Sequence, residues 1–108
     1  MTADRNPQPL VAETCRRLGD TLLAEEPRVR IFLFGSRAAG RGHPRSDIDL
    51  GVDLGRPVPP ELMARLRDAF DALPILQRVD LVDFAEADPE FKQVALQDAL
   101  TLYERQAA

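Results

Sequence analysis

The sequence contains very little cysteine, and this excludes several kinds of small protein. Cys15 is the only cysteine in 108 residues, so an internal disulfide cannot form and cysteines cannot build a zinc site. Chains that lack disulfides are typical of reducing compartments. We therefore expect a cytoplasmic protein.

Long hydrophobic runs and an excess of positive charge are also missing. No apolar stretch approaches the roughly 20 residues of a membrane-spanning helix, and residues 1–7 lack the apolar segment of a signal peptide, so we expect no membrane association. Lys and Arg number 14 against 18 Asp and Glu, which gives a net charge of −4. This balance disfavours a broad basic face, and we expect no direct nucleic-acid binding, although local charge still permits a nucleotide to bind.

The sequence does contain enough apolar residues for one folded domain, because 44% of it is hydrophobic. Apolar spacing predicts helices over residues 9–26, 62–73 and 89–100, and strands over residues 28–34, 47–54 and 78–84. We predict an α+β fold in which a small mixed β-sheet packs with helices. Residues 1–8 are expected to form a flexible lead, the domain is expected to span residues 9–104, and Tyr103 is expected to anchor the last helix.

One stretch combines residue types that serve phosphate and metal chemistry. Gly35-Ser36 follows the first predicted strand, and ten residues later comes Asp47-Ile48-Asp49. Glycine lets backbone N–H groups approach a phosphate, and the Ser36 hydroxyl can join them. Side chains two apart on a strand point the same way, about 7 Å apart, so Asp47 and Asp49 can share a metal or bridge a pair of metals.

A third acid on a neighbouring strand would complete such a site. Asp80 lies inside the strand predicted over residues 78–84, where an acid without a partner is costly. Three carboxylates could hold two Mg²⁺ ions for in-line displacement at phosphorus. The alternative for Asp80 is a structural pairing with an arginine such as Arg78. Asp83 is expected on the opposite face, and Asp53 is expected to cap the strand end.

Basic residues gather in the loop between the glycine and the acids. Arg37, Arg41 and Arg45 lie there, and the ten loop residues include no acid. Their guanidinium groups could screen triphosphate charge and stabilise the departing pyrophosphate. We expect one or two of them to touch phosphate, and we assign Arg37 and Arg41 to the nucleotide site. A P-loop is excluded, because that motif needs Lys-Ser/Thr after its second glycine and this loop has Arg41-Gly42 there.

Taken together, these residues resemble the motifs of nucleotidyltransferases of the DNA polymerase β superfamily, specifically a minimal nucleotidyltransferase (MNT) domain. The matching stretches are Phe34-Gly35-Ser36-Arg37-Ala38, Gly40, Ser46-Asp47-Ile48-Asp49-Leu50 and Val79-Asp80-Leu81-Val82. The resemblance implies the polymerase β-like fold, ATP as substrate and Mg²⁺ as cofactor. It also implies that Gly35 and Ser36 hold phosphate, that Asp47 and Asp49 bind metal, and that Asp80 is the third carboxylate, which helps to activate the attacking hydroxyl.

The same resemblance points to a protein partner. Relatives of this size are commonly antitoxins that resemble enzymes moving AMP from ATP onto a tyrosine of a HEPN-type ribonuclease toxin. It therefore implies a HEPN-type toxin as partner, in a possible hetero-oligomer. Larger superfamily members carry an extra domain that selects the acceptor. A chain of this length has no room for one, so we expect the partner to present the hydroxyl.

Two other functions remain open from the sequence. The first is a non-catalytic antitoxin, a binding module that neutralises its partner by complex formation alone. The second is a small-molecule nucleotidyltransferase whose acceptor site comes from another subunit. Decay of the site is disfavoured because its residues are intact, although a dual role is not excluded; these residues are Gly35, Ser36, Asp47, Asp49 and Asp80.

Overall fold

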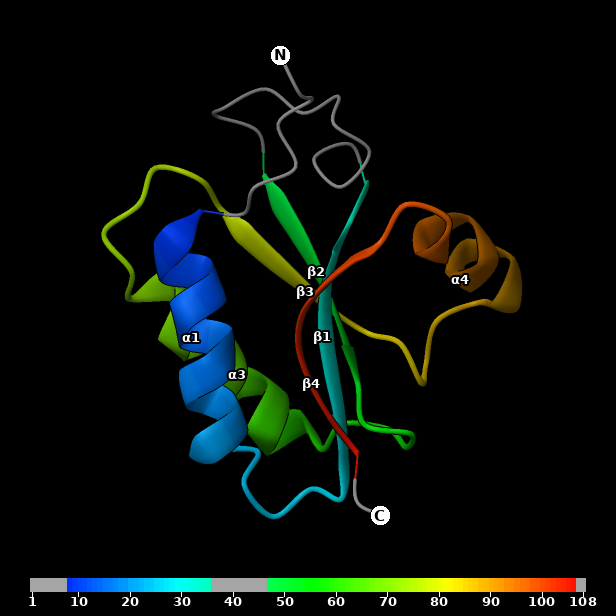
Figure 1. Ribbon diagram of the computed structural model, residues 1–108, viewed down its shortest axis with the longest axis horizontal. Coiled ribbons are helices and arrows are strands. Elements are labelled where there is room, and N and C mark those ends of the chain that lie inside the picture. The colour runs from blue at the N-terminus through cyan, green and yellow to red at the C-terminus, as the bar shows by residue number, and fades with distance from the viewer. Residues whose placement is uncertain (1–7, 36–46, 107–108) are drawn as a thin grey trace.

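The computed structural model describes residues 8–35 and 47–106, which form a sheet with helices on both sides (Figure 1). The elements are α1 Pro9–Asp20, β1 Arg28–Phe34, β2 Ile48–Asp53, α3 Pro60–Asp71, β3 Val79–Asp83, α4 Pro89–Leu96 and β4 Leu100–Gln106. The predicted α+β fold is confirmed. Each predicted helix and strand is present; the bounds of β1 are as predicted, and those of the other predicted elements differ at one or both ends. None of the described helices is long and apolar enough to cross a membrane.

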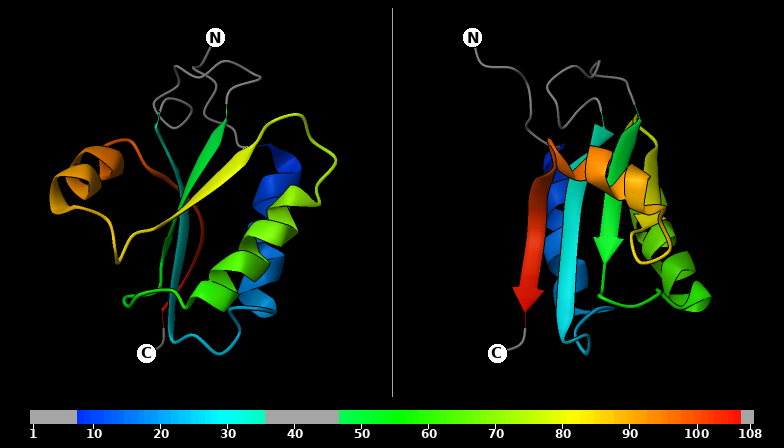
Figure 2. Two further views of the ribbon diagram at one scale, coloured as in Figure 1. Left: turned by 180° about the vertical axis from the view of Figure 1, so that it is seen from behind. Right: turned by 90° about the vertical axis from the view of Figure 1, so that its right-hand side faces the viewer.

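The described strands form one mixed sheet in the order β3-β2-β1-β4. β1 is antiparallel to both β2 and β4, whereas β2 and β3 are parallel and are joined through α3, as a parallel pair requires. Helices α1 and α3 cover one face of the sheet, and α4 lies on the other (Figures 1 and 2). Because of this topology, β2 and β3 begin at the same end of the sheet, beside the point where β1 ends.

Each face of the sheet has its own apolar core. The larger core lies toward α1 and α3 and includes Val11, Leu18, Ile31, Leu33, Leu50 and Leu66. The smaller core lies toward α4 and consists of Phe32, Phe34, Phe84 and Ala95. The rings of Phe32 and Phe84 meet edge to face with their centroids 4.6 Å apart. Alternate residues of β1 therefore serve opposite cores, which fixes the face to which each side chain of β2 points.

The start of α4 follows the predicted local chemistry. The Asp88 carboxylate accepts a hydrogen bond from the backbone N–H of Glu90 at 2.8 Å, and Pro89 occupies the first helical position. Pro9 holds the same position in α1. These local signals place the helix starts correctly.

The prediction was wrong at the end of the chain. The last helix stops at Leu96 rather than near residue 100, and Leu100–Gln106 form an unpredicted fourth strand, antiparallel to β1. Tyr103 therefore does not anchor the last helix; it lies on β4, pairs with Ile31 and packs against the larger core. A register shift in this pairing interrupts the alternation of β4, so the period-two signal of the strand is weak in the sequence.

The first helix also ends earlier than predicted, at Asp20 rather than near residue 26. Leu22 and Leu23 continue the apolar spacing past the helix, and Leu23 is fully buried although it lies in the turn that follows. When a turn after a helix is buried, its apolar residues can have the same spacing as the apolar residues of a longer helix, so spacing cannot tell the two apart. Tertiary packing, which spacing does not reveal, therefore decides where α1 ends.

Candidate active site

Strand register brings together residues that are distant in the sequence. Asp49 of β2 is the cross-strand partner of Phe34 on one side and of Asp80 of β3 on the other. Partners in register have their side chains on the same face, here the face of the smaller core. Gly35 directly follows Phe34, and Asp47 directly precedes β2. Four of the predicted site residues thus lie at one end of the sheet.

Asp49 lies in an environment that opposes its negative charge. Burial raises the pKa of its carboxyl, and the negative charges of Asp80 and Asp47 raise this pKa further. Asp49 is half-buried, whereas Asp47 is exposed. An ionised cluster of this kind is costly unless a cation balances it.

Gly35 approaches the Asp49 carboxylate so closely that an added side chain would force the carboxylate to move. Its φ of +80° lies in the left-handed region that L residues avoid. A Cβ atom built on Gly35 would lie 2.9 Å from Oδ2 of Asp49. The glycine therefore provides both the turn out of β1 and the space beside the carboxylate.

The alternative pairing of Asp80 with Arg78 is present in the structure. Nε of Arg78 donates to Oδ1 of Asp80 at 3.1 Å, and the two side chains are 75% and 37% exposed. Exposed ion pairs contribute roughly 0–1 kcal/mol, so this contact holds Asp80 only weakly. The pairing is compatible with a second role for the carboxylate.

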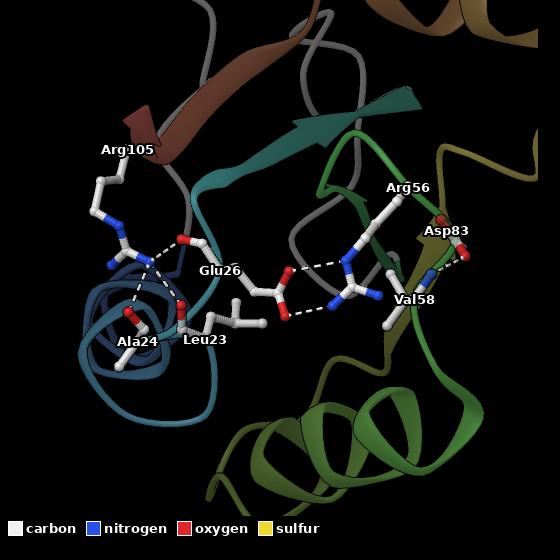
Figure 3. A network of polar contacts seen from close by, with 7 residues as sticks. All are labelled: Leu23, Ala24, Glu26, Arg56, Val58, Asp83 and Arg105. Carbon is white, nitrogen blue, oxygen red and sulfur yellow. Dashed lines mark hydrogen bonds and ion pairs between the residues drawn. The ribbon is translucent and has the colours of Figure 1, made fainter. Parts of the chain in front are cut away.

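Two other acids of these strands have structural roles; the role of Asp53 and the face of Asp83 are as predicted, whereas the contacts of Asp83 were not predicted. Asp53 accepts a hydrogen bond from the Gly55 N–H at 2.8 Å and pairs with Arg28 at 3.3 Å. Asp83 lies on the face opposite Asp80, where its oxygens accept from the N–H groups of Val58 and of Ala85 (Val58 is drawn in Figure 3). Both carboxylates cap turns and are thereby excluded from the candidate site.

The chemistry of Asp47, Asp49 and Asp80 suits a hard divalent cation, because carboxylate oxygens are the ligands that Mg²⁺ prefers. Within residues 8–35 and 47–106, however, no group of three or more acid, histidine or cysteine side chains is placed so that it could hold a metal ion. The donor type and the like charges fit Mg²⁺, while the remaining ligands must come from elsewhere, as substrate phosphates do for this ion. The predicted phosphate ligands Ser36, Arg37 and Arg41 lie outside the described residues, as does Arg45.

The structure also reveals a cleft that was not predicted from the sequence. It has a volume of about 410 Å³ and is lined by Arg67, Asp71, Arg78, Val79, Asp80 and Leu81. The cleft lies between α3 and the outer edge of β3. Asp80 lines this cleft and is also a residue of the candidate site. Arg67 gives no signal in the sequence, because a charged residue on a helix is most often simply solvated.

Comparison with known proteins agrees with this geometry. Residues 20–108 match the family model described as Polymerase beta, Nucleotidyltransferase. "Probable protein adenylyltransferase MntA" of Haemophilus influenzae is 29% identical over 80 residues, which are 74% of this chain and 70% of that protein.

Two solved complexes share the fold. A toxin–antitoxin structure with AMP-PNP has a TM-score of 0.59 and 28% identity, over 85% of this chain and 72% of the other. A tri-AMPylated HEPN toxin in complex with an MNT antitoxin, from Shewanella oneidensis, has a matching chain with a TM-score of 0.59 and 25% identity, over 90% of this chain and 72% of the other.

Proposed function

Because this chain belongs to the polymerase β nucleotidyltransferase family, we propose that it transfers AMP from ATP to a tyrosine hydroxyl of a HEPN-type toxin and so acts as an antitoxin. The observation that carries the proposal is the register of Asp49 with Asp80, beside Gly35. This arrangement gathers carboxylates next to backbone that can closely approach a phosphate.

In the proposed reaction the acceptor oxygen attacks the α-phosphorus of ATP, and the bond to the bridging oxygen breaks so that pyrophosphate leaves. Gly35 and Ser36 hold the phosphates, and Arg37 and Arg41 offset the charge that develops on the leaving group. Asp80 helps to activate the attacking hydroxyl. Asp47, Asp49 and Asp80 would hold two Mg²⁺ ions, which when bound would neutralise phosphate charge.

Two relatives support the identity of the acceptor. One carries the name of a protein adenylyltransferase, and the other is an MNT antitoxin in complex with a tri-AMPylated HEPN toxin. The AMP-PNP complex of a third supports ATP as the nucleotide. The partner would then complete a hetero-oligomer and supply the acceptor hydroxyl.

The test is AMP transfer to the product of the neighbouring gene, measured as a mass increase of that protein after incubation with ATP and Mg²⁺. We expect one or more AMP units to be added, and chelation with EDTA to stop the reaction. Asp49→Asn should abolish transfer while the protein still folds, as judged by circular dichroism. Asp53→Asn is the matched control, because it removes a carboxylate from the same strand and keeps an oxygen for the Gly55 N–H.

Three outcomes would argue against the proposal. Full transfer by Asp49→Asn would contradict the role of the carboxylates. A partner that binds tightly and stays unmodified would indicate neutralisation by complex formation alone. A mass increase on a small molecule, with none on the protein, would indicate a small-molecule nucleotidyltransferase.

A further inference from the structure

The cleft beside Asp80 has an unpaired strand on one side. β3 lies at the edge of the sheet, and no described strand pairs with its outer side. Arg78 O accepts from Ile48 N, and Phe84 N donates to Val52 O, so residues 78 and 84 bond inward to β2. Because bonding alternates along a parallel strand, Val79 and Leu81 direct their backbone N–H and C=O groups outward, along the cleft.

The lining of the cleft carries two arginines and two aspartates, so its formal charges balance as long as Asp80 pairs with Arg78. Within the described residues Arg67 makes no ion pair, and Arg78 pairs only with Asp80, which itself belongs to the reaction site. If Asp80 bound a cation or a hydroxyl instead, the Arg78 guanidinium would be released, and two arginines would then face the single carboxylate of Asp71. Asp71, one helical turn after Arg67, is the acid that opposes them.

We propose that this cleft binds the acceptor protein through an extended, acidic segment that runs along β3 and delivers its hydroxyl to Asp80. An exposed strand edge favours an extended occupant, because its outward N–H and C=O groups can pair with a second backbone. Arg67 and Arg78 favour carboxylates in that segment. The inference rests on the proposed function, since it concerns the acceptor of the same reaction.

The experiment reverses the charge of Arg67 and compares the result with the same change at Arg65. Both arginines are exposed on α3, but only Arg67 lines the cleft. We expect Arg67→Glu to raise KM for the partner protein, and the Kd of the complex, by about 5–30-fold. In Arg67→Glu, kcat and KM for ATP should stay the same. The control Arg65→Glu should change KM for the partner protein less than about twofold.

A second variant gives the opposite sign and so separates charge from misfolding. Asp71→Lys removes the opposing acid and should lower KM for the partner several-fold, whereas damage to the fold would raise it. The inference is overturned if Arg65→Glu and Arg67→Glu act alike, if Asp71→Lys weakens binding while its circular dichroism and Tm are unchanged, or if Arg67→Glu lowers kcat alone. It is also overturned if the cleft binds single-stranded RNA in place of the partner, with RNA competing in an Arg67-dependent manner.

The proposed function fails in a different way. In that case the unaltered protein transfers no AMP to the partner, whatever the state of Arg67. Binding measured by calorimetry without ATP still tests the cleft, because the Kd of the partner must then follow the charge at residues 67 and 71. The two failures are therefore distinguishable.

Discussion

Arg105 of β4 connects the end of the chain to the turn after α1, and replacing it with methionine tests that connection. Its Nη1 donates to Gly19 O at 2.7 Å, and its Nη2 donates to Leu23 O at 2.6 Å and to Glu26 O at 2.8 Å. Figure 3 shows the guanidinium directed at this turn. The last carbonyls of a helix have no partner within it, so a cation that binds them stabilises the helix end.

The size of the effect follows from these contacts. A hydrogen bond from a charged donor contributes roughly 1.5–3 kcal/mol, but carbonyls near the surface recover water when the donor is removed. The three contributions therefore do not add in full. We expect Arg105→Met, which keeps most of the aliphatic stem, to lower the free energy of unfolding by about 2–4 kcal/mol. For a domain of this size the Tm should fall by about 10–30 °C.

The measurement is urea and thermal unfolding followed by circular dichroism at constant m-value. Arg16→Met is the control, because Arg16 is exposed on α1 and the same atoms are removed without loss of these bonds; it should change stability by less than about 0.5 kcal/mol. Arg56→Met removes the 2.7 Å ion pair with Glu26 at the same turn and should cost at most about 1 kcal/mol. If Arg105→Met lowers the free energy of unfolding no more than Arg16→Met does, other contacts stabilise the turn and the role assigned to Arg105 is wrong.

Two further predictions concern the candidate site. The raised pKa of Asp49 means that the folded protein binds this proton more readily than the unfolded chain. Asp49 thus costs no stability below its ordinary pKa of 3.8, because it is protonated in both the folded and the unfolded state. As the pH rises from there through the raised pKa, the unfolded chain gives up this proton more readily than the folded protein, and the free energy of unfolding falls. Asp49→Asn should therefore raise Tm by a few degrees at pH 7 without divalent metal and by much less at about pH 3; an unchanged or lower Tm at pH 7 would contradict the account. Gly35→Ala should lower AMP transfer at least about tenfold, because left-handed backbone strains an L residue by about 1–2 kcal/mol and the new Cβ displaces the Asp49 carboxylate. Gly55→Ala, at a φ of +76° and away from the site, is the matched control and should retain transfer even though it is strained.

The part of the site that could be predicted from the sequence is carried by local patterns. Polar and apolar residues alternate along β2, which places Asp49 on the face opposite the buried Ile48 and Leu50. The number of residues between Gly35 and Asp47 can be read directly from the sequence. These signals survive because the face of a strand and the need for glycine are set by the residues themselves. Asp80 was predicted in the same way, as an acid inside an apolar strand, and the register places it beside Asp49.

The parts that were missed depend on contacts between distant residues. β4 is a strand because it pairs with β1 and packs Tyr103 against α1, and its own sequence alternates poorly across the register shift. The cleft depends on α3 lying beside the outer edge of β3, which brings Arg67 near Arg78. Neither arrangement leaves a periodic trace in the sequence, so neither could be read from spacing.

The parallel register of β2 and β3 ties fold and candidate chemistry together more tightly than any single residue does. If β3 slipped by one position, Asp49 would face Val79 or Leu81 in place of Asp80, and these apolar side chains would move from the larger core to the opposite face. Burial of Val79 and Leu81 therefore enforces the pairing of two carboxylates that repel each other. The hydrophobic core on the far side of the same strands therefore offsets the repulsion between the two carboxylates.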